Sequence, residues 1–111
     1  MEPLKGFNAE NWDSDVLKSE KPVLVEFYAT WCEPCERQTQ ILQELLEEGV
    51  ANIVIGWIDY DRHEELANRY QVFGIPSLLL FEHGKVKEFF EGVTGMQALR
   101  HALVEPSHTS S

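Results

Sequence analysis

The run PVLVEFYA, residues 22–29, constrains the fold of this chain more than any other segment. It is almost continuously apolar and starts at a proline, which is typical of a strand that is covered on both faces. Such strands lie in the middle of sheets whose two faces carry helices. The chain has 111 residues, 43% of them hydrophobic, which is enough for one core of this kind and too few for two. We therefore predict one α/β domain over residues 1–105.

Helical patterns alternate with strand patterns along the chain. Between Pro34 and Glu48, four apolar side chains recur at helical spacing, and Gly49 follows as a stop signal. Asn8 is a candidate N-cap for an earlier helix in which two apolar residues share a face, and Asp61 is a candidate N-cap for a short helix over residues 61–70. A last helix is predicted over residues 95–104, and residues 106–111 predict a mobile tail because they lack apolar periodicity.

Three further strands are predicted from the remaining apolar runs. One covers residues 52–59, and two cover residues 77–92 with a turn at His83-Gly84, which is the pattern of an antiparallel hairpin. The resulting order is (β)αβαβαββα. It predicts parallel strands joined by helical crossovers in the first half and an antiparallel edge at the end.

The charge of the chain excludes two classes of partner. Nineteen acidic and nine basic side chains give a net charge of -10, which repels the phosphates of nucleic acids and anionic lipids. No window approaches the roughly 20 apolar residues that span a bilayer, and the N-terminus lacks the pattern of a secretory signal. We expect a cytoplasmic protein that binds neither nucleic acid nor membrane.

Both cysteines lie in the stretch WCEPC, residues 31–35, where the central strand ends and the long helix begins. Pro34 is compatible with a first helical turn because the N–H that it lacks would have no partner there. Cys32 would lie at the helix N-terminus, which favours negative charge, and Cys35 would lie one turn later, within bonding reach. This placement predicts an exposed Cys32 thiol of lowered pKa that attacks a disulfide, and a more buried Cys35 that resolves the mixed disulfide.

Two other uses of the cysteine pair are open but weaker. A structural zinc site needs four ligands, and the four histidines of the chain show no paired spacing. A purely structural disulfide would close a loop of about four residues, which stabilises a fold by only about 2 kcal/mol. We therefore expect no metal and no other cofactor.

The chain resembles the thioredoxin family over roughly residues 7–104. The resemblance rests on VEFYATWCEPC, on FGIPSLLLF about forty residues later, and on Gly92. It implies a thioredoxin fold, with a central mixed five-stranded sheet flanked by four helices, and a monomer. It also implies a protein disulfide reductase that receives electrons from a thioredoxin reductase-type flavoprotein and acts on disulfide-containing client proteins. Two alternatives are a disulfide oxidant or isomerase of the same fold, and a non-catalytic binding module.

The family pattern assigns roles to individual positions. Cys32 is the nucleophile and Cys35 the resolving thiol, and the bond before Pro76 is expected to be cis, with Pro76 against the cysteine pair. The residues expected to frame the site and its substrate groove are Trp31, Pro34, Gly74, Ile75, Pro76 and Gly92.

Glu26 is the only charged residue in the apolar run VLVEFYA. A carboxylate in a central strand is costly, and desolvation raises its pKa. The family typically has an aspartate here, proposed to accept the proton of the resolving cysteine through water, so the resemblance implies this role for Glu26. Trp57 stands where the family has a lysine near this carboxylate, which favours a still higher Glu26 pKa. The alternative is that Glu26 points to a sheet edge and is solvated.

Glu33, between the cysteines, stands where the family has glycine, and with Trp57 it is a candidate for tuning the redox chemistry. An exposed carboxylate some 6 to 8 Å from a thiolate opposes it by only about 0.5 kcal/mol. We therefore predict that Glu33→Gly slightly lowers the pKa of the Cys32 thiol, measured as the pH dependence of its alkylation rate. A pKa that rose or stayed unchanged in the variant would contradict this.

Overall fold

Strand β2 (Val23–Tyr28) lies at the centre of the sheet, as the apolar run predicts. It pairs in parallel with β3 (Val54–Asp59) on one side and antiparallel with β4 (Ser77–Glu82) on the other. Strand β1 (Lys5–Phe7) extends the sheet beside β3, and β5 (Lys85–Glu91) extends it beside β4. The order β1-β3-β2-β4-β5 confirms the mixed five-stranded sheet.

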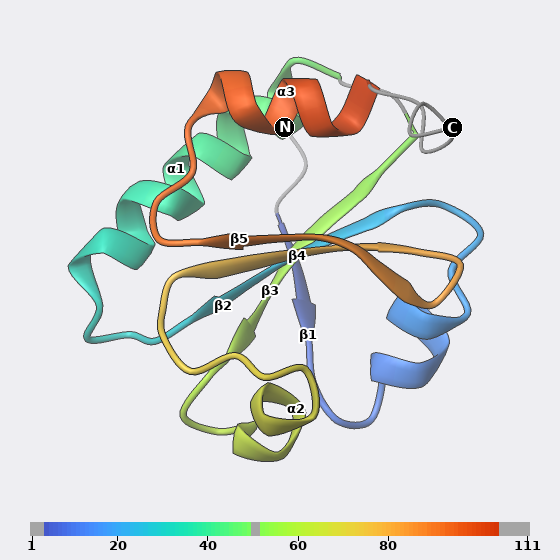
Figure 1. Cartoon of the computed structure of the whole chain (residues 1–111), viewed down its shortest axis with the longest axis vertical. Helices are drawn as coiled ribbons and strands as arrows, with labels where there is room; N and C mark the ends of the chain where they lie inside the picture. The colour runs from blue at the N-terminus through green and yellow to red at the C-terminus, as the bar shows by residue number, and fades with distance from the viewer. Residues whose placement is uncertain (1–3, 50–51, 105–111) are drawn as a thin grey trace.

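The computed structural model describes residues 4–49 and 52–104. Within them, four helical segments surround the sheet (Figure 1). The first, η1 (Asp13–Leu17), is a π-type turn. The other three are the α-helices α1 (Glu33–Glu47), α2 (Glu64–Arg69) and α3 (Met96–Val104). No helix in the described part of the chain is both long and apolar enough to cross a membrane. The tail predicted for residues 106–111 lies outside the described residues.

The two faces of β2 contribute to two different cores. Val23, Val25 and Phe27 pack with side chains of η1 and α2, whereas Leu24 packs with side chains of α1 and α3. Successive side chains of a strand point to opposite faces, so both sets are buried and the sequence reads as one apolar run. By the same alternation, Glu26 shares the face of Leu24 and is directed toward α1.

The hairpin predicted at the end of the sheet is confirmed. Strands β4 and β5 are antiparallel, and the two residues between them are His83, with φ of 54°, and Gly84, with φ of 79°. Positive φ at both turn positions matches the right-handed twist of the flanking strands. This turn brings Glu91 and Gly92 back beside the start of β4.

The predicted N-cap of the short helix is wrong. Helix α2 begins at Glu64 after His63, and no side chain caps it. The turn before it is instead closed by Asp59, whose Oδ1 accepts the backbone N–H groups of Asp61 at 2.9 Å and Arg62 at 3.2 Å. Asp59 is the last residue of β3, so the carboxylate that closes this turn comes from the end of the strand, two residues before the predicted cap.

Asn8 does cap a turn, although not the regular helix that was predicted. Its Oδ1 accepts the N–H groups of Glu10 at 2.9 Å and Asn11 at 2.8 Å. The helical segment that follows begins only at Asp13 and is of π type. Trp12 and Val16 are nevertheless both buried, as their predicted common face requires.

Trp12 anchors the core between η1, β2 and α2. It is 2% exposed and its ring meets the rings of Phe27 and Phe81 edge-on. We predict that Trp12→Ala lowers the free energy of unfolding by about 3–5 kcal/mol in urea denaturation, because it leaves a large cavity. The control is Trp31→Ala, which should change it by less than about 0.5 kcal/mol because Trp31 is 68% exposed. Equal losses in the two variants would contradict this.

Candidate active site

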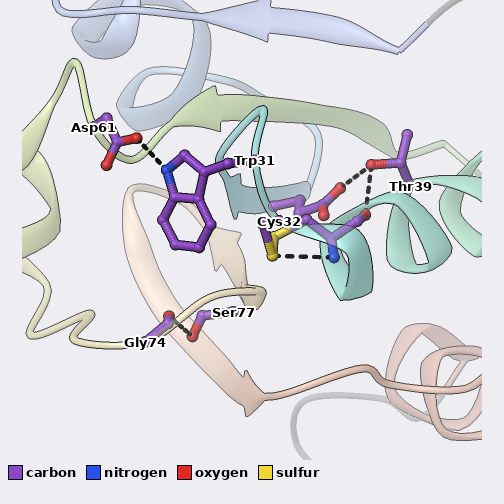
Figure 2. The surroundings of a disulfide bond; sticks show 8 residues. Trp31, Cys32, Thr39, Asp61, Gly74 and Ser77 are labelled. Carbon is purple, nitrogen blue, oxygen red and sulfur yellow. Dashed lines mark hydrogen bonds between the residues drawn. A yellow bond between two sulfur atoms is a disulfide. The ribbon is translucent and has the colours of Figure 1, made fainter.

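The two cysteines form a disulfide at the N-terminus of α1, with their Cα atoms 5.2 Å apart (Figure 2). Cys32 is the N-cap residue, its backbone is extended, and Glu33 and Pro34 follow as exposed residues of the first helical turn. The Sγ of Cys32 accepts the backbone N–H of Cys35 at 3.2 Å. After reduction, this donor and the helix N-terminus would stabilise negative charge on the Cys32 sulfur.

The predicted exposure of Cys32 is corrected by the structure. Cys32 is only 4% exposed and Cys35 is fully buried. The disulfide packs on Ala29, and Tyr28 and Ile75 pack against it. Cys32 is therefore the more accessible residue of the pair, as expected, but only a small part of it is in contact with solvent.

The segment before β4 forms the other side of the site. The Ile75–Pro76 peptide bond is cis, which confirms the expectation. Pro76 accepts the N–H of Gly92 at 2.9 Å, and the Ser77 hydroxyl donates to the carbonyl of Gly74 at 2.7 Å. A cavity of about 380 Å³ is lined by Phe73, Gly74, Ile75, Pro76, Ser77, Glu91 and Gly92. The structure thus brings Gly74, Ile75, Pro76 and Gly92 together in one depression, whereas Trp31 and Pro34 do not line it.

Trp31 lies beside the disulfide and is exposed. Its indole N–H donates to Oδ2 of Asp61 at 2.7 Å (Figure 2). The Asp61 carboxylate, which was predicted to cap a helix, contacts the indole instead. Phe73, at the groove, is 74% exposed. The site therefore presents two exposed aromatic side chains, of which the sequence predicted only Trp31.

Glu26 is fully buried, so the interpretation that it is solvated at a sheet edge is wrong. It lies in β2 between two neighbouring strands. Its Oε1 accepts the Thr39 hydroxyl at 2.8 Å, and its Oε2 has no hydrogen-bond partner among the described residues. Burial raises the pKa of Glu26 from 4.5 to about 7, and the Thr39 hydrogen bond offsets part of that rise. The carboxyl group can therefore exchange a proton near neutral pH.

Trp57 is the residue of β3 that pairs with Glu26 in register. It is half-buried, and its ring packs edge-on against Tyr28, with centroids 5.1 Å apart. Trp57 stands where the resemblance implies a lysine, so the strand position paired with Glu26 carries no positive charge. Burial also raises the pKa of Tyr28, with smaller contributions from the charges of Asp59 and Glu26.

Two polar residues of α1, Gln38 and Thr39, make contacts that were not predicted from the sequence. Thr39 lies one turn after Cys35 and contacts Glu26. Gln38 is fully buried, and its amide accepts the N–H of Thr94 at 2.6 Å and donates to the Thr94 carbonyl at 3.1 Å, which fixes the chain just after Gly92. The available signal was a polar side chain on the buried face of an amphipathic helix. No group of three or more possible metal ligands occurs among the described residues.

A family model described as Thioredoxin matches residues 3–105. The chain belongs to the thioredoxin family. It is 45% identical over 82 residues to "Thioredoxin Y, chloroplastic" of Oryza sativa subsp. japonica, a match that covers 74% of this chain and 49% of that protein. It is 40% identical over 90 residues to "Thioredoxin" of Mycobacterium tuberculosis (strain ATCC 25618 / H37Rv), covering 81% of this chain and 78% of that protein.

A third member of the thioredoxin family joins two proteins in one chain. "Bifunctional thioredoxin reductase/thioredoxin" of Mycobacterium leprae (strain TN) is 40% identical over 90 residues, which cover 81% of this chain and 20% of that protein. The chain thus spans about half the length of the rice relative and a smaller part of this one. The thioredoxin-family relatives and the cysteine pair at disulfide distance support thiol–disulfide oxidoreductase chemistry at this site.

Burial of Glu26 makes the stability of the protein depend on pH. In the unfolded chain Glu26 ionises near 4.5, whereas in the folded protein its pKa is about 7. Between these values the folded state binds the proton more tightly, so the free energy of unfolding falls as pH rises, by about 3 kcal/mol in total. Urea denaturation of the oxidised protein from pH about 4 to about 8 should show this fall, and Glu26→Gln should remove it.

The matched control is Glu88→Gln, because Glu88 is exposed on β5. This variant should follow the wild-type curve over the whole pH range. If the curves of Glu26→Gln and wild type ran parallel, Glu26 would not have the raised pKa.

Proposed function

We propose that this protein reduces protein disulfides through reversible oxidation of the Cys32–Cys35 dithiol. The observation that carries the proposal is the position of the disulfide between two different environments. On its open side lie the exposed Trp31 indole and Ile75, which packs against the cysteine pair and also lines the groove at Pro76. On its inner side, Thr39 connects the buried Glu26 carboxyl group to the backbone of Cys35.

In the first step, the Cys32 thiolate attacks one sulfur of a client disulfide. A bond forms between Cys32 Sγ and that sulfur, the client S–S bond breaks, and the second client sulfur leaves as a thiolate. The Cys35 N–H, 3.2 Å from the Cys32 sulfur, favours the attacking thiolate. The groove residues would bind the client chain as an extended segment along the backbone at Ile75 and Pro76.

In the second step, Cys35 gives its proton to Glu26 through water and attacks Cys32 Sγ. The Cys32–Cys35 bond forms, the bond between Cys32 and the client breaks, and the first client sulfur leaves as a thiolate. The pair loses two electrons and the client disulfide gains two. A carboxyl group with a pKa of about 7 suits this proton transfer because it is partly ionised near neutral pH.

We further propose that a thioredoxin reductase-type flavoprotein returns the pair to the dithiol, and that the clients are disulfide-containing proteins. The fused relative from Mycobacterium leprae supports this donor, because its name joins a thioredoxin reductase to a thioredoxin. A dithiol reductant requires a reducing compartment, and the cytoplasm is the one that we propose. Three of the plant relatives carry the word chloroplastic in their names.

The proposal is tested by turnover on insulin as a model disulfide, with NADPH and a thioredoxin reductase. The wild-type protein should sustain NADPH oxidation, and Cys32→Ser should reduce it to the background rate because the attacking sulfur is gone. Cys35→Ser should instead form a mixed disulfide with the client that dithiothreitol releases, since the resolving thiol is absent. Cys32→Ser is the control that forms no such adduct. Lack of turnover in wild type with any reductant would refute a reductase and favour a binding module.

A further inference from the structure

The hydroxyl of Thr39 lies within hydrogen-bond distance of two acceptors. Its Oγ1 is 2.8 Å from Oε1 of Glu26 and 3.0 Å from the carbonyl oxygen of Cys35, as Figure 2 shows with dashed lines. A hydroxyl group carries one proton, so Thr39 can donate to only one of these acceptors at a time. The choice between them depends on whether Glu26 is charged.

When Glu26 is ionised, the carboxylate is the stronger acceptor, and Thr39 donates to it. When Glu26 is protonated, the carboxyl group carries an O–H of its own, which can donate to Thr39 Oγ1. Thr39 is then free to donate to the carbonyl of Cys35. The single hydroxyl proton of the ionised state and the two hydroxyl protons of the protonated state therefore each have an acceptor, and the hydrogen bonds reverse without any movement of the backbone.

Among the described residues, Thr39 is the main polar neighbour of Glu26. In the sheet, the residues that pair with Glu26 are Trp57 of β3 and Leu78 of β4, neither of which is charged. From α1 the contact is Thr39, one turn after Cys35. Tyr28 is a titratable group linked to this region, and burial and the charges of Asp59, Glu26 and Arg62 all contribute to its pKa. Glu36 lines a surface cavity together with Thr39.

We propose that Thr39 is a positioning residue whose hydroxyl reverses its hydrogen bond with the protonation of Glu26 and thereby couples that proton to the backbone of Cys35. Its importance for resolving the mixed disulfide rests on the proposed function. As Cys35 gives up its thiol proton, Glu26 gains an O–H that donates to Thr39, and Thr39 donates to the Cys35 carbonyl. Only one proton is transferred, from Cys35 Sγ to the Glu26 carboxylate.

The test compares Thr39→Val, which keeps the shape and removes the hydroxyl, with Thr39→Ser, which keeps the hydroxyl. Carbon NMR of the oxidised protein follows the Glu26 carboxyl carbon and the Cys35 carbonyl carbon as pH changes. In wild type and Thr39→Ser, both signals should titrate with one midpoint. In Thr39→Val, the Glu26 midpoint should rise by about one pH unit, because a donor to the charged form is lost, and the Cys35 signal should no longer follow it.

An unchanged midpoint in Thr39→Val, with the Cys35 signal still following Glu26, would overturn the proposal. If Thr39→Val does not fold, Thr39→Ala makes the same comparison. Two variants serve as controls for the Cys35 signal: Glu26→Gln alone, and Glu26→Gln combined with Thr39→Val. In both of them the Cys35 carbonyl carbon should show no titration near the Glu26 midpoint.

The pH dependence of mixed-disulfide resolution tests whether Thr39 contributes to catalysis. The rate at which the mixed disulfide is resolved should rise with pH through the Glu26 midpoint. In Thr39→Val, the midpoint of this pH–rate profile should move to higher pH by the same amount as the midpoint of the NMR titration. An unchanged midpoint of the pH–rate profile would refute the role of Thr39 in resolving the mixed disulfide. If wild type reduces no disulfide while the NMR shift is observed, the proposed function fails and the hydrogen-bond coupling stands; if wild type reduces disulfides without the shift, the coupling fails alone.

Discussion

Burial of β2 on both faces is the constraint on which the rest of the structure depends. One face of the strand packs with η1 and α2 and the other with α1 and α3, so the strand must occupy the middle of the sheet. Its end delivers the chain to the N-terminus of α1, where Cys32 becomes the N-cap residue. The same alternation directs Glu26 toward α1. The packing that forms the core therefore also places a carboxyl group near the cysteine pair.

The site combines two environments with opposite electrostatic effects. The helix N-terminus and the Cys35 N–H favour negative charge on Cys32, whereas burial disfavours negative charge on Glu26 and raises its pKa to about 7. A thiolate is thus favoured on Cys32, and a protonated carboxyl group is favoured on Glu26. This division suits a reaction in which the client disulfide accepts electrons through the Cys32 sulfur while the thiol proton of Cys35 passes to Glu26. Thr39 contacts both the carboxyl group and the helix that carries the inner sulfur.

Local signals in the sequence predicted the elements that depend on local physics. The central strand, the helix that starts near Pro34 and the hairpin at His83-Gly84 follow from apolar periodicity and from residues with special backbone preferences. The cis bond before Pro76 came instead from the resemblance to the family. Residue roles that depend on distant partners were not predictable in this way. The Asp61 carboxylate contacts an indole thirty residues earlier, and Gln38 bonds a residue fifty-six positions later. Exposure of Cys32 depended in the same way on side chains from other segments.

The reduction potential of the Cys32–Cys35 pair tests most directly whether this protein is a reductant. It is measured by redox equilibrium with dithiothreitol, with the fraction of disulfide determined after rapid alkylation. Thioredoxins have potentials near about -270 mV, and a value near this one is predicted for this protein. A potential above about -180 mV, in the range of disulfide isomerases and oxidants, would contradict the proposed direction of electron flow.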